Sequence, residues 1–295
     1  MTSFSCAGCG IEENNDEGIK LKMCTACKSV RYCSVKCQKE HRSQHKKACK
    51  KRAAELKEIL FKQPESNHNG DCPICFLPLP LDANKFNMYS CCCQYVCIGC
   101  VRACVRVGGD AFKKCPFCRK PTFISKDQIR TNYERRAEAN DPLATHQLGK
   151  MLYDKGDFRG AFELISKAAK LGCADAHFNL YMMYRDGQGV EKDEKKMVRS
   201  LEEAAIAGHA RARFDLAVFE GREGRHERGV KHLIICSKLG HAASVEVLKN
   251  FCEYGRVSIE DHDAAISGYQ AAVEAMKSKE REEAEAVRKR DEKAT

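Results

Sequence analysis

Length, composition and charge restrict the classes of protein to which this chain can belong. Its 295 residues are enough for two or three domains, and 20 of them are cysteines, of which only Cys173, Cys236 and Cys252 follow residue 118. The sequence shows no apolar signal-peptide core and no apolar run of about 18 residues, so we expect a cytoplasmic or nuclear protein without a membrane span. In a reducing compartment, cysteines at this density bind metal instead of forming disulfides.

The formal charge of +10 at pH 7 counts every cysteine as neutral. Metal-bound cysteines are thiolates, and binding of four zinc ions lowers the net charge to about +3. Charge therefore gives little support to a nucleic-acid-binding regulator, and no segment predicts a helix with base-reading side chains. We expect protein partners, and neither nucleic acid nor membrane.

Residues 1–52 contain the first group of ligand-type residues. Two Cys-x-x-Cys pairs precede the segment Y-C-S-x-x-C-Q, and a segment H-K-x-x-C follows, so eight ligands are available for two tetrahedral zinc ions. This pattern resembles a MYND finger. The resemblance implies two ligand sets, one made of Cys6, Cys9, Cys33 and Cys37 and the other of Cys24, Cys27, His45 and Cys49.

His41 is an alternative ligand, because His41, His45 and Cys49 recur on one face of a predicted helix. The family spacing favours His45 and leaves His41 beside the site or at the surface. Arg42 departs from the family, in which an aromatic residue usually follows the position of His41. We therefore expect an altered groove where MYND fingers bind proline-rich peptides.

Residues 53–70 predict a linker. A helix continues through Leu56, Ile59 and Leu60, which share one face, and the segment Q-P-E-S-N-H-N-G-D then ends it. The linker leads to a second cysteine-rich module.

Residues 71–122 form that module, with three Cys-x-x-Cys pairs and one C-C-C run. Two tetrahedral zinc ions need eight ligands, so two must come from Cys91, Cys92 and Cys93. The spacing resembles an all-cysteine RING domain, in which ligand pairs interleave in a cross-brace. The resemblance implies one zinc ion on Cys72, Cys75, Cys97 and Cys100, and a second on Cys115, Cys118 and two of the central three.

The central three cysteines leave one choice open. Cys92 stands five residues before Cys97, at the position of the family's third ligand. Gln94 occupies the position of the usual histidine, so either Cys91 or Cys93 must complete the second site. We predict Cys91.

Three further residues resemble those of RING-type ubiquitin ligases: Ile74, Pro116 and Arg119. In that family the apolar pair contacts the ubiquitin-conjugating enzyme, and the basic residue holds the linked ubiquitin in a reactive pose. Such a domain supplies no nucleophile, so we predict no catalytic residue, and its contribution is positioning. The alternative is that Ile74 and Pro116 only shape the zinc loops and that Arg119 is a solvated cation.

A repeat runs through residues 123–277, with steps of 32, 36 and 32 residues. A capping box at Ser125 and Gln128 predicts a preceding helix that ends near residue 140. Each repeat has a small residue and a leucine at fixed positions: Ala144, Ala176, Ala212 and Ser244, and Leu148, Leu180, Leu216 and Leu248. Gly172, Gly208 and Gly240 close helical segments as left-handed caps. A period in the thirties predicts stacked helical hairpins.

These units resemble Sel1-like repeats, which are related to the tetratricopeptide repeat. The second unit fits best, because its G-x-G-V loop is absent from the first and third. A box from Ser258 to Asp261 predicts a last helix whose early part caps the array. Five histidines are scattered through the repeats, and we assign no metal or catalytic role to them: His146, His177, His209, His232 and His241.

Residues 278–295 are charged on every face and predict a solvated helix or a disordered tail. The expected fold class is therefore mainly α, with two small cross-brace zinc modules of irregular α+β structure followed by an α-solenoid. The leading functional hypothesis is a zinc-dependent ubiquitin ligase or ligase-like adaptor, with partners held by the solenoid and the MYND finger. The alternative is a non-enzymatic scaffold in which zinc is purely structural.

Overall fold

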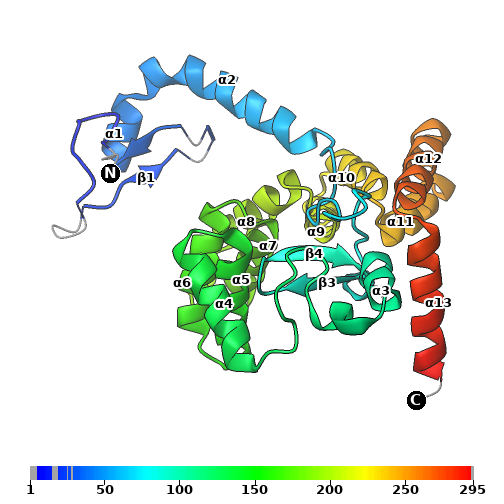
Figure 1. The fold of residues 1–295 in the computed structure, drawn as a ribbon. Helices are drawn as coiled ribbons and strands as arrows, with labels where there is room; N and C mark the ends of the chain where they lie inside the picture. Colours follow the sequence, from blue (N-terminus) through cyan, green and yellow to red (C-terminus); the bar gives the residue numbers. More distant parts are fainter. Residues whose placement is uncertain (1–4, 15–18, 25, 28, 294–295) are drawn as a thin grey trace. The chain divides into compact units, whose positions relative to one another are not determined.

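The computed structural model describes residues 5–14, 19–24, 26–27 and 29–293 (Figure 1). The chain divides into two compact units, Met1–Lys62 and Gln63–Thr295, which we describe separately. The fold is mainly α-helical, as predicted. Within the described residues no helix is both long and apolar enough to cross a membrane.

The first unit contains one small hairpin and two helices. Strands β1 (Lys22–Met23) and β2 (Arg31–Tyr32) pair antiparallel, and α1 (Val35–Glu40) and α2 (Arg42–Phe61) follow. Ser34 caps α1 by accepting a hydrogen bond from the backbone N–H of Cys37. The buried core consists of cysteines with Leu21 and Tyr32, so it has too little apolar surface to fold without a metal.

The second unit begins with the central cysteine module, residues 71–122. A 3-10 turn, η1 (Ala83–Lys85), leads into an antiparallel hairpin of β3 (Phe86–Tyr89) and β4 (Gln94–Cys97). Helix α3 (Ile98–Arg106) and a second 3-10 turn, η2 (Gly109–Lys113), complete it. Val96 of β4 and Leu79 are fully buried in the core of this module.

Nine helices between residues 126 and 275 form the repeat array of the described chain. Their bounds are α4 (Lys126–Glu138), α5 (Pro142–Asp154), α6 (Phe158–Lys170), α7 (Ala174–Asp186), α8 (Glu194–Ile206), α9 (Ala210–Arg222), α10 (His226–Lys238), α11 (Ala242–Glu253) and α12 (Ile259–Ala275). Ser125 and Ser258 both cap their helices, because each hydroxyl accepts a hydrogen bond from the backbone N–H three residues later. The predicted capping box is confirmed at Ser125, where the Gln128 side chain returns the bond, whereas the Asp261 carboxylate accepts from the Ser258 hydroxyl.

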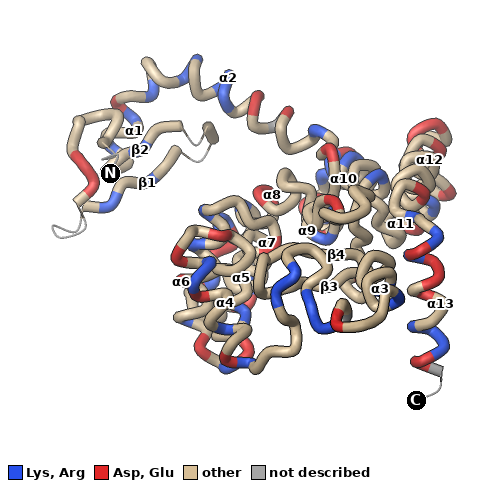
Figure 2. Tube along the Cα trace, viewed as in Figure 1, with Lys and Arg blue, Asp and Glu red and all other residues tan. Residues whose placement is uncertain are grey.

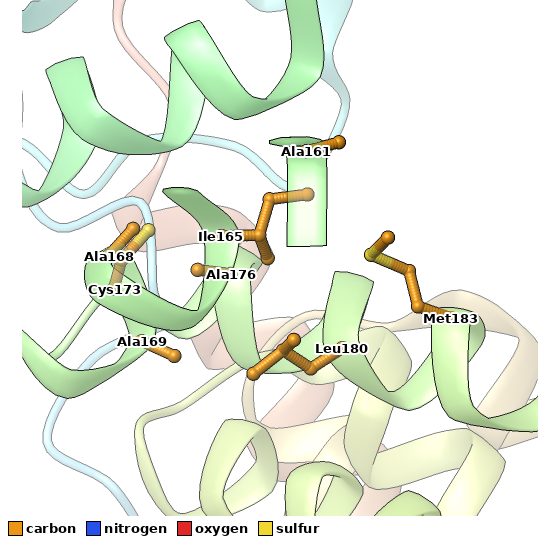
Figure 3. Close-up of a cluster of buried hydrophobic side chains, with 8 residues drawn as sticks. All are labelled: Ala161, Ile165, Ala168, Ala169, Cys173, Ala176, Leu180 and Met183. Atoms are coloured by element: carbon orange, nitrogen blue, oxygen red, sulfur yellow. The ribbon is translucent and has the colours of Figure 1, made fainter. Parts of the chain in front are cut away.

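The repeat positions form the core of the array. The small residues at the start of each unit, Ala144, Ala176, Ala212 and Ser244, are fully buried, so neighbouring helices approach closely. Between α6 and α7, Ile165 and Met183 fill the space among alanines (Figure 3). Gly172, Gly208 and Gly240 have φ angles of 92°, 81° and 90°, which confirms the predicted left-handed caps.

The charged tail forms a helix, which is one of the two predicted alternatives, but this helix is not solvated on every face. Residues Lys279–Lys293 form helix α13, which packs against α3. Ala284 is 1% exposed and Arg281 is 7% exposed. Glu285 and Glu283 form ion pairs with Lys85 and Arg106 of the central module, at 2.8 and 2.6 Å. Charges alternate along this helix (Figure 2), and its packing uses ion pairs and one small alanine, so the sequence shows no apolar stripe.

Candidate metal centres

Two groups of ligand-type side chains meet in the first unit. Cys6 and Cys9 lie in a tight turn, and Cys33 and Cys37 flank the start of α1. Their sulfur atoms lie within 4.8 Å of one another, with Cys9 and Cys33 at 3.5 Å and Cys33 and Cys37 at 3.6 Å. Zinc–sulfur bonds of about 2.3 Å at tetrahedral angles place sulfurs about 3.8 Å apart, so the group fits a zinc ion.

The second group joins the loop after β1 to helix α2. Cys27 Sγ lies 3.1 Å from His45 Nε2, and Cys24 Sγ lies 3.8 Å from Cys49 Sγ. Because His45 and Cys49 are one helical turn apart on α2, both side chains reach the same point. Burial opposes ionisation of Cys27, but hydrogen bonds from the backbone and side chain of Ser29 outweigh it and lower the pKa of this thiol to about 6.

His41 is not part of this group. Its Nδ1 lies 3.0 Å from the Tyr32 hydroxyl, and its ring stacks on that of His45. His41 therefore orients the neighbouring imidazole while the hydroxyl of the buried Tyr32 finds a partner.

The central module contains a third group, made of Cys72, Cys75, Cys97 and Cys100. Cys72 and Cys100 are 3.9 Å apart at sulfur, and Cys75 and Cys97 are 3.8 Å apart. Hydrogen bonding by Cys97 and by the backbone N–H groups of Cys75 and Ile74 outweighs burial and lowers the pKa of Cys72 to about 4. A low pKa favours the thiolate that zinc requires.

The fourth group contains Cys91 and leaves out Cys93. Cys91 and Cys92 meet Cys115 and Cys118, with sulfur distances of 3.3 Å from Cys91 to Cys118 and 3.7 Å from Cys92 to Cys115. Cys93 has a φ of 51°, and its buried side chain lies instead among residues of the repeat array. The backbone turn after Cys92 thus directs the third sulfur away from the group.

Fifteen of the sixteen residues in the four groups stand where the family spacings place ligands, and the sixteenth is Cys91, for which the spacing had left Cys93 as an alternative. In the central module, Cys72 and Cys75 share a group with Cys97 and Cys100, and Cys91 and Cys92 share a group with Cys115 and Cys118. Successive pairs along the sequence therefore belong to alternate groups, which is the arrangement of a cross-brace. Three groups have four cysteines and one has three cysteines and a histidine, and these are donor sets of structural zinc sites. Each group is complete with four protein ligands, which leaves no open position for a substrate.

Arg281 of α13 reaches the third group from the far end of the sequence. Its Nη2 donates to Cys75 Sγ at 3.3 Å and to the carbonyl of Leu77 at 3.1 Å. Its Nη1 donates to the carbonyls of Pro78 and Met276, both at 2.7 Å. A hydrogen bond to a ligand sulfur orients that sulfur and stabilises its negative charge. Sequence analysis missed this residue, and no local pattern in the charged tail distinguishes it.

Gly99 makes room for this contact. A Cβ atom at this position of α3 would lie 2.9 Å from the backbone nitrogen of Arg281. Any larger residue would therefore separate α13 from the central module and move the guanidinium away from Cys75.

The three residues expected to contact a conjugating enzyme lie on the zinc-binding loops. Ile74 and Pro116 are half-buried, and Arg119 is exposed with a φ of 64°. Next to them, Phe76 is 76% exposed and Phe117 is 47% exposed. Exposed rings at both loops indicate a surface that a protein partner could cover.

A histidine–aspartate cluster also escaped the sequence analysis. Asp175 Oδ1 lies 3.4 Å from His68 Nε2 and 3.5 Å from His209 Nε2. Burial opposes ionisation of Asp175, but hydrogen bonds from His209 and His68 outweigh it and hold its pKa far below the usual range. His209 recurs with His241 after the repeat glycine, but the contribution of His68 from the linker had no sequence signal.

This cluster stabilises the contact between the linker and the repeat array, and its geometry does not fit a metal ion. His209 Nδ1 accepts a hydrogen bond from the backbone N–H of Ala212, so the proton of the neutral ring is on Nε2 and is donated to Asp175. The two imidazole rings stack with centroids 4.1 Å apart, whereas two metal ligands would direct their ring planes at a common point. Together with a backbone bond from His68 to Gly208, the cluster fastens the linker to the array.

Comparison with protein-family models supports the resemblance of the first unit to a MYND finger. The family model of the MYND finger matches residues 6–49. No curated protein matches the chain.

Solved structures similar to the chain are helical. A Sel1 repeat protein from Oxalobacter formigenes is 23% identical, with 51% of this chain and 64% of that chain covered and a TM-score of 0.43. The protective antigen c5321 of uropathogenic Escherichia coli, which displays an SLR fold, is 24% identical, with 56% and 36% covered and a TM-score of 0.39. Immunity protein Pa5087 from Pseudomonas aeruginosa is 20% identical, with 71% and 70% covered and a TM-score of 0.36.

The chain thus combines a segment that matches the MYND finger model, a second cysteine-rich module and an array of helical hairpins. Its four ligand groups can hold four zinc ions.

Proposed function

We propose that this chain is a zinc-dependent protein-interaction scaffold and a RING-type ubiquitin ligase, in which the central cysteine module recruits a ubiquitin-conjugating enzyme. One observation carries the proposal. The loops of the two central ligand groups present Ile74 and Pro116 at the surface, beside the exposed rings of Phe76 and Phe117. Two exposed aromatic rings on the loops that carry the ligands favour burial against a partner surface.

The proposed role of each residue follows from its exposure. Ile74, Pro116 and the two rings would bury apolar area against the conjugating enzyme. Arg119 carries an exposed guanidinium just after Cys118 and would donate hydrogen bonds to the linked ubiquitin. No nucleophile is required, because holding two reactants in one geometry can accelerate transfer by several orders of magnitude.

Ubiquitin discharge from a panel of loaded conjugating enzymes tests this proposal. The zinc-loaded full-length protein should accelerate discharge to free lysine with at least one of them. Ile74→Ala and Arg119→Ala should each reduce the rate by roughly tenfold or more. Lys120→Ala, which removes an exposed cation from the next position, is the matched control and should leave the rate unchanged.

The competing function is a scaffold without ligase activity. Absence of acceleration across the panel, from protein shown by native mass spectrometry to hold four zinc ions, would favour it. The same result with unchanged partner binding by the repeats would assign the central module a structural role only.

A further inference from the structure

The repeat array has an apolar pocket of about 340 Å³ between helices α9, α10 and α11. Phe214 and Ala217 from α9, Leu233 from α10 and Phe251 from α11 form its walls. These side chains belong to the outer edge of the local core, whose fully buried members include Leu248 and Ala265. The pocket is therefore a depression in a rigid part of the array.

Gly221 keeps this pocket open. It lies in the last turn of α9, and a Cβ atom added there would meet no atom within 4 Å. Glycine within a helix costs about 1 kcal/mol relative to alanine, and no close contact or left-handed backbone requires it at this position. A larger side chain at Gly221 would project toward the pocket and fill it.

The rim of the pocket carries positive charge only. Its polar residues are Arg222, His226 and Arg256, and no carboxylate is among the described residues that line it. Neither Arg222 nor Arg256 has an ion-pair partner in the described structure, and the guanidinium of Arg256 lies over the face of the Phe251 ring, 6.0 Å from its centroid.

Two carboxylates that flank Arg222 in the sequence, Glu220 and Glu223, are already paired with other arginines. Glu220 is buried and pairs with Arg228 at 2.9 Å and with Arg225. Glu223 pairs with the second nitrogen of Arg225 at 3.5 Å. The two arginines at the rim consequently retain their charge for a partner.

We propose that this pocket binds an acidic peptide segment of a protein partner, with one bulky aliphatic or aromatic side chain in the pocket and neighbouring carboxylates on Arg222 and Arg256. The apolar walls and the open position at Gly221 define the anchor. The two arginines of the rim favour acidic peptide residues on either side of this anchor, because bidentate arginine–carboxylate hydrogen bonds add specificity. This inference names the partner chemistry for the interaction role proposed above, but it does not depend on ligase activity.

Selection from a random peptide library displayed on phage tests the proposal. The bait is the full-length zinc-loaded protein, and enriched peptides are then synthesised and their affinity is measured by fluorescence polarisation. Enriched peptides should share a bulky apolar residue with at least two Asp or Glu residues close to it. Their affinity should decrease steeply with salt concentration.

Three variants locate the site. Gly221→Leu should weaken binding by about tenfold or more because it fills the pocket, while Gly221→Ala, the matched control, should bind as the wild type does. Arg222→Glu combined with Arg256→Glu should abolish binding of acidic peptides. Circular dichroism verifies that each variant is folded.

Several outcomes would overturn the inference. They are the absence of enriched peptides with a folded bait, an enriched set without acidic residues, and binding that is unchanged in Gly221→Leu. Loss of ubiquitin discharge with intact peptide binding would refute only the ligase proposal, so the two failures are distinguishable.

Discussion

The two cysteine-rich modules of this chain use similar ligands but are supported in different ways. In the described part of the first unit, the buried cluster around the ligand groups contains Leu21 and Tyr32 besides four ligand cysteines, so the metal ions hold the fold together. In the central module, Cys93 and Met88 pack against Tyr133, Ala137 and Ala144 of the repeat array. In the first unit the zinc sites therefore take the place of an apolar core, whereas in the central module they act together with packing against the repeat helices.

Three sets of contacts attach the central module to the rest of the second unit. The repeat helices cover Cys93, and α13 brings Arg281 to Cys75. The cluster of His68, Asp175 and His209 connects the linker to the repeat array. We therefore expect loss of a metal site to spread from the central module into the helices, and to remain local in the first unit.

The largest expected effect comes from removing one ligand in each module. Structural sites of this kind hold zinc with on the order of 10 kcal/mol, so either substitution should unfold its own module. Cys33→Ser should abolish protection from hydrogen exchange in residues 5–52 alone. Cys97→Ser should also reduce protection in α4, α5 and α13, and equal protection of these helices in both variants would contradict the comparison.

A second comparison tests adjacent cysteines of the central module. Cys91→Ser should remove one zinc ion, because its sulfur completes the fourth group. Cys93→Ser should retain all four ions and lower the free energy of unfolding by about 1–3 kcal/mol, because it buries a hydroxyl among apolar side chains. Native mass spectrometry counts the ions, and three ions in Cys93→Ser would reverse the assignment.

Arg281→Ala tests the contribution of α13. The substitution removes four hydrogen bonds, three to part-buried backbone carbonyls and one to a ligand sulfur, at a cost on the order of 3 kcal/mol. Release of zinc to a chelator should become faster, and in the cobalt-substituted protein the thiolate-to-metal absorption band should shift. Arg290→Ala, on an exposed part of the same helix, is the matched control, and an unchanged band in Arg281→Ala would exclude a role at Cys75.

The last expected effect concerns the dependence of stability on pH. Burial lowers the pKa of His146 to about 4 and that of His232 to about 3, so both remain neutral in the native state. Because the unfolded chain takes up these protons near pH 6.5, their contribution to stability is present above that pH and is lost as the pH falls toward 4.

For His146 the loss across this window is about 3 kcal/mol. Urea unfolding followed by helical circular dichroism at several pH values measures it. His146→Gln should flatten the profile between pH 6.5 and 4, whereas His226→Gln, which changes an exposed histidine, should leave it as steep as in the wild type.

The sequence by itself determined the local architecture. Cysteine spacing grouped the ligands because a Cys-x-x-Cys turn directs two sulfurs to one point, and this relation is local. The helical repeats followed from residues with a fixed period, such as Ala176 and Ala212, and from glycines that need a left-handed backbone, such as Gly208. The capping box at Ser125 was predictable for the same reason, since its hydrogen bonds span three residues.

Only the tertiary structure decided which distant segments meet. Cys91 and Cys93 are equivalent in spacing, and a positive φ together with a contact to the repeat array separates their roles. Arg281 lies more than 200 residues from Cys75, and His68 lies more than 100 residues from Asp175. Such contacts depend on how the module and the helices are packed, and a charged tail or an isolated histidine carries no periodic signal of its partner.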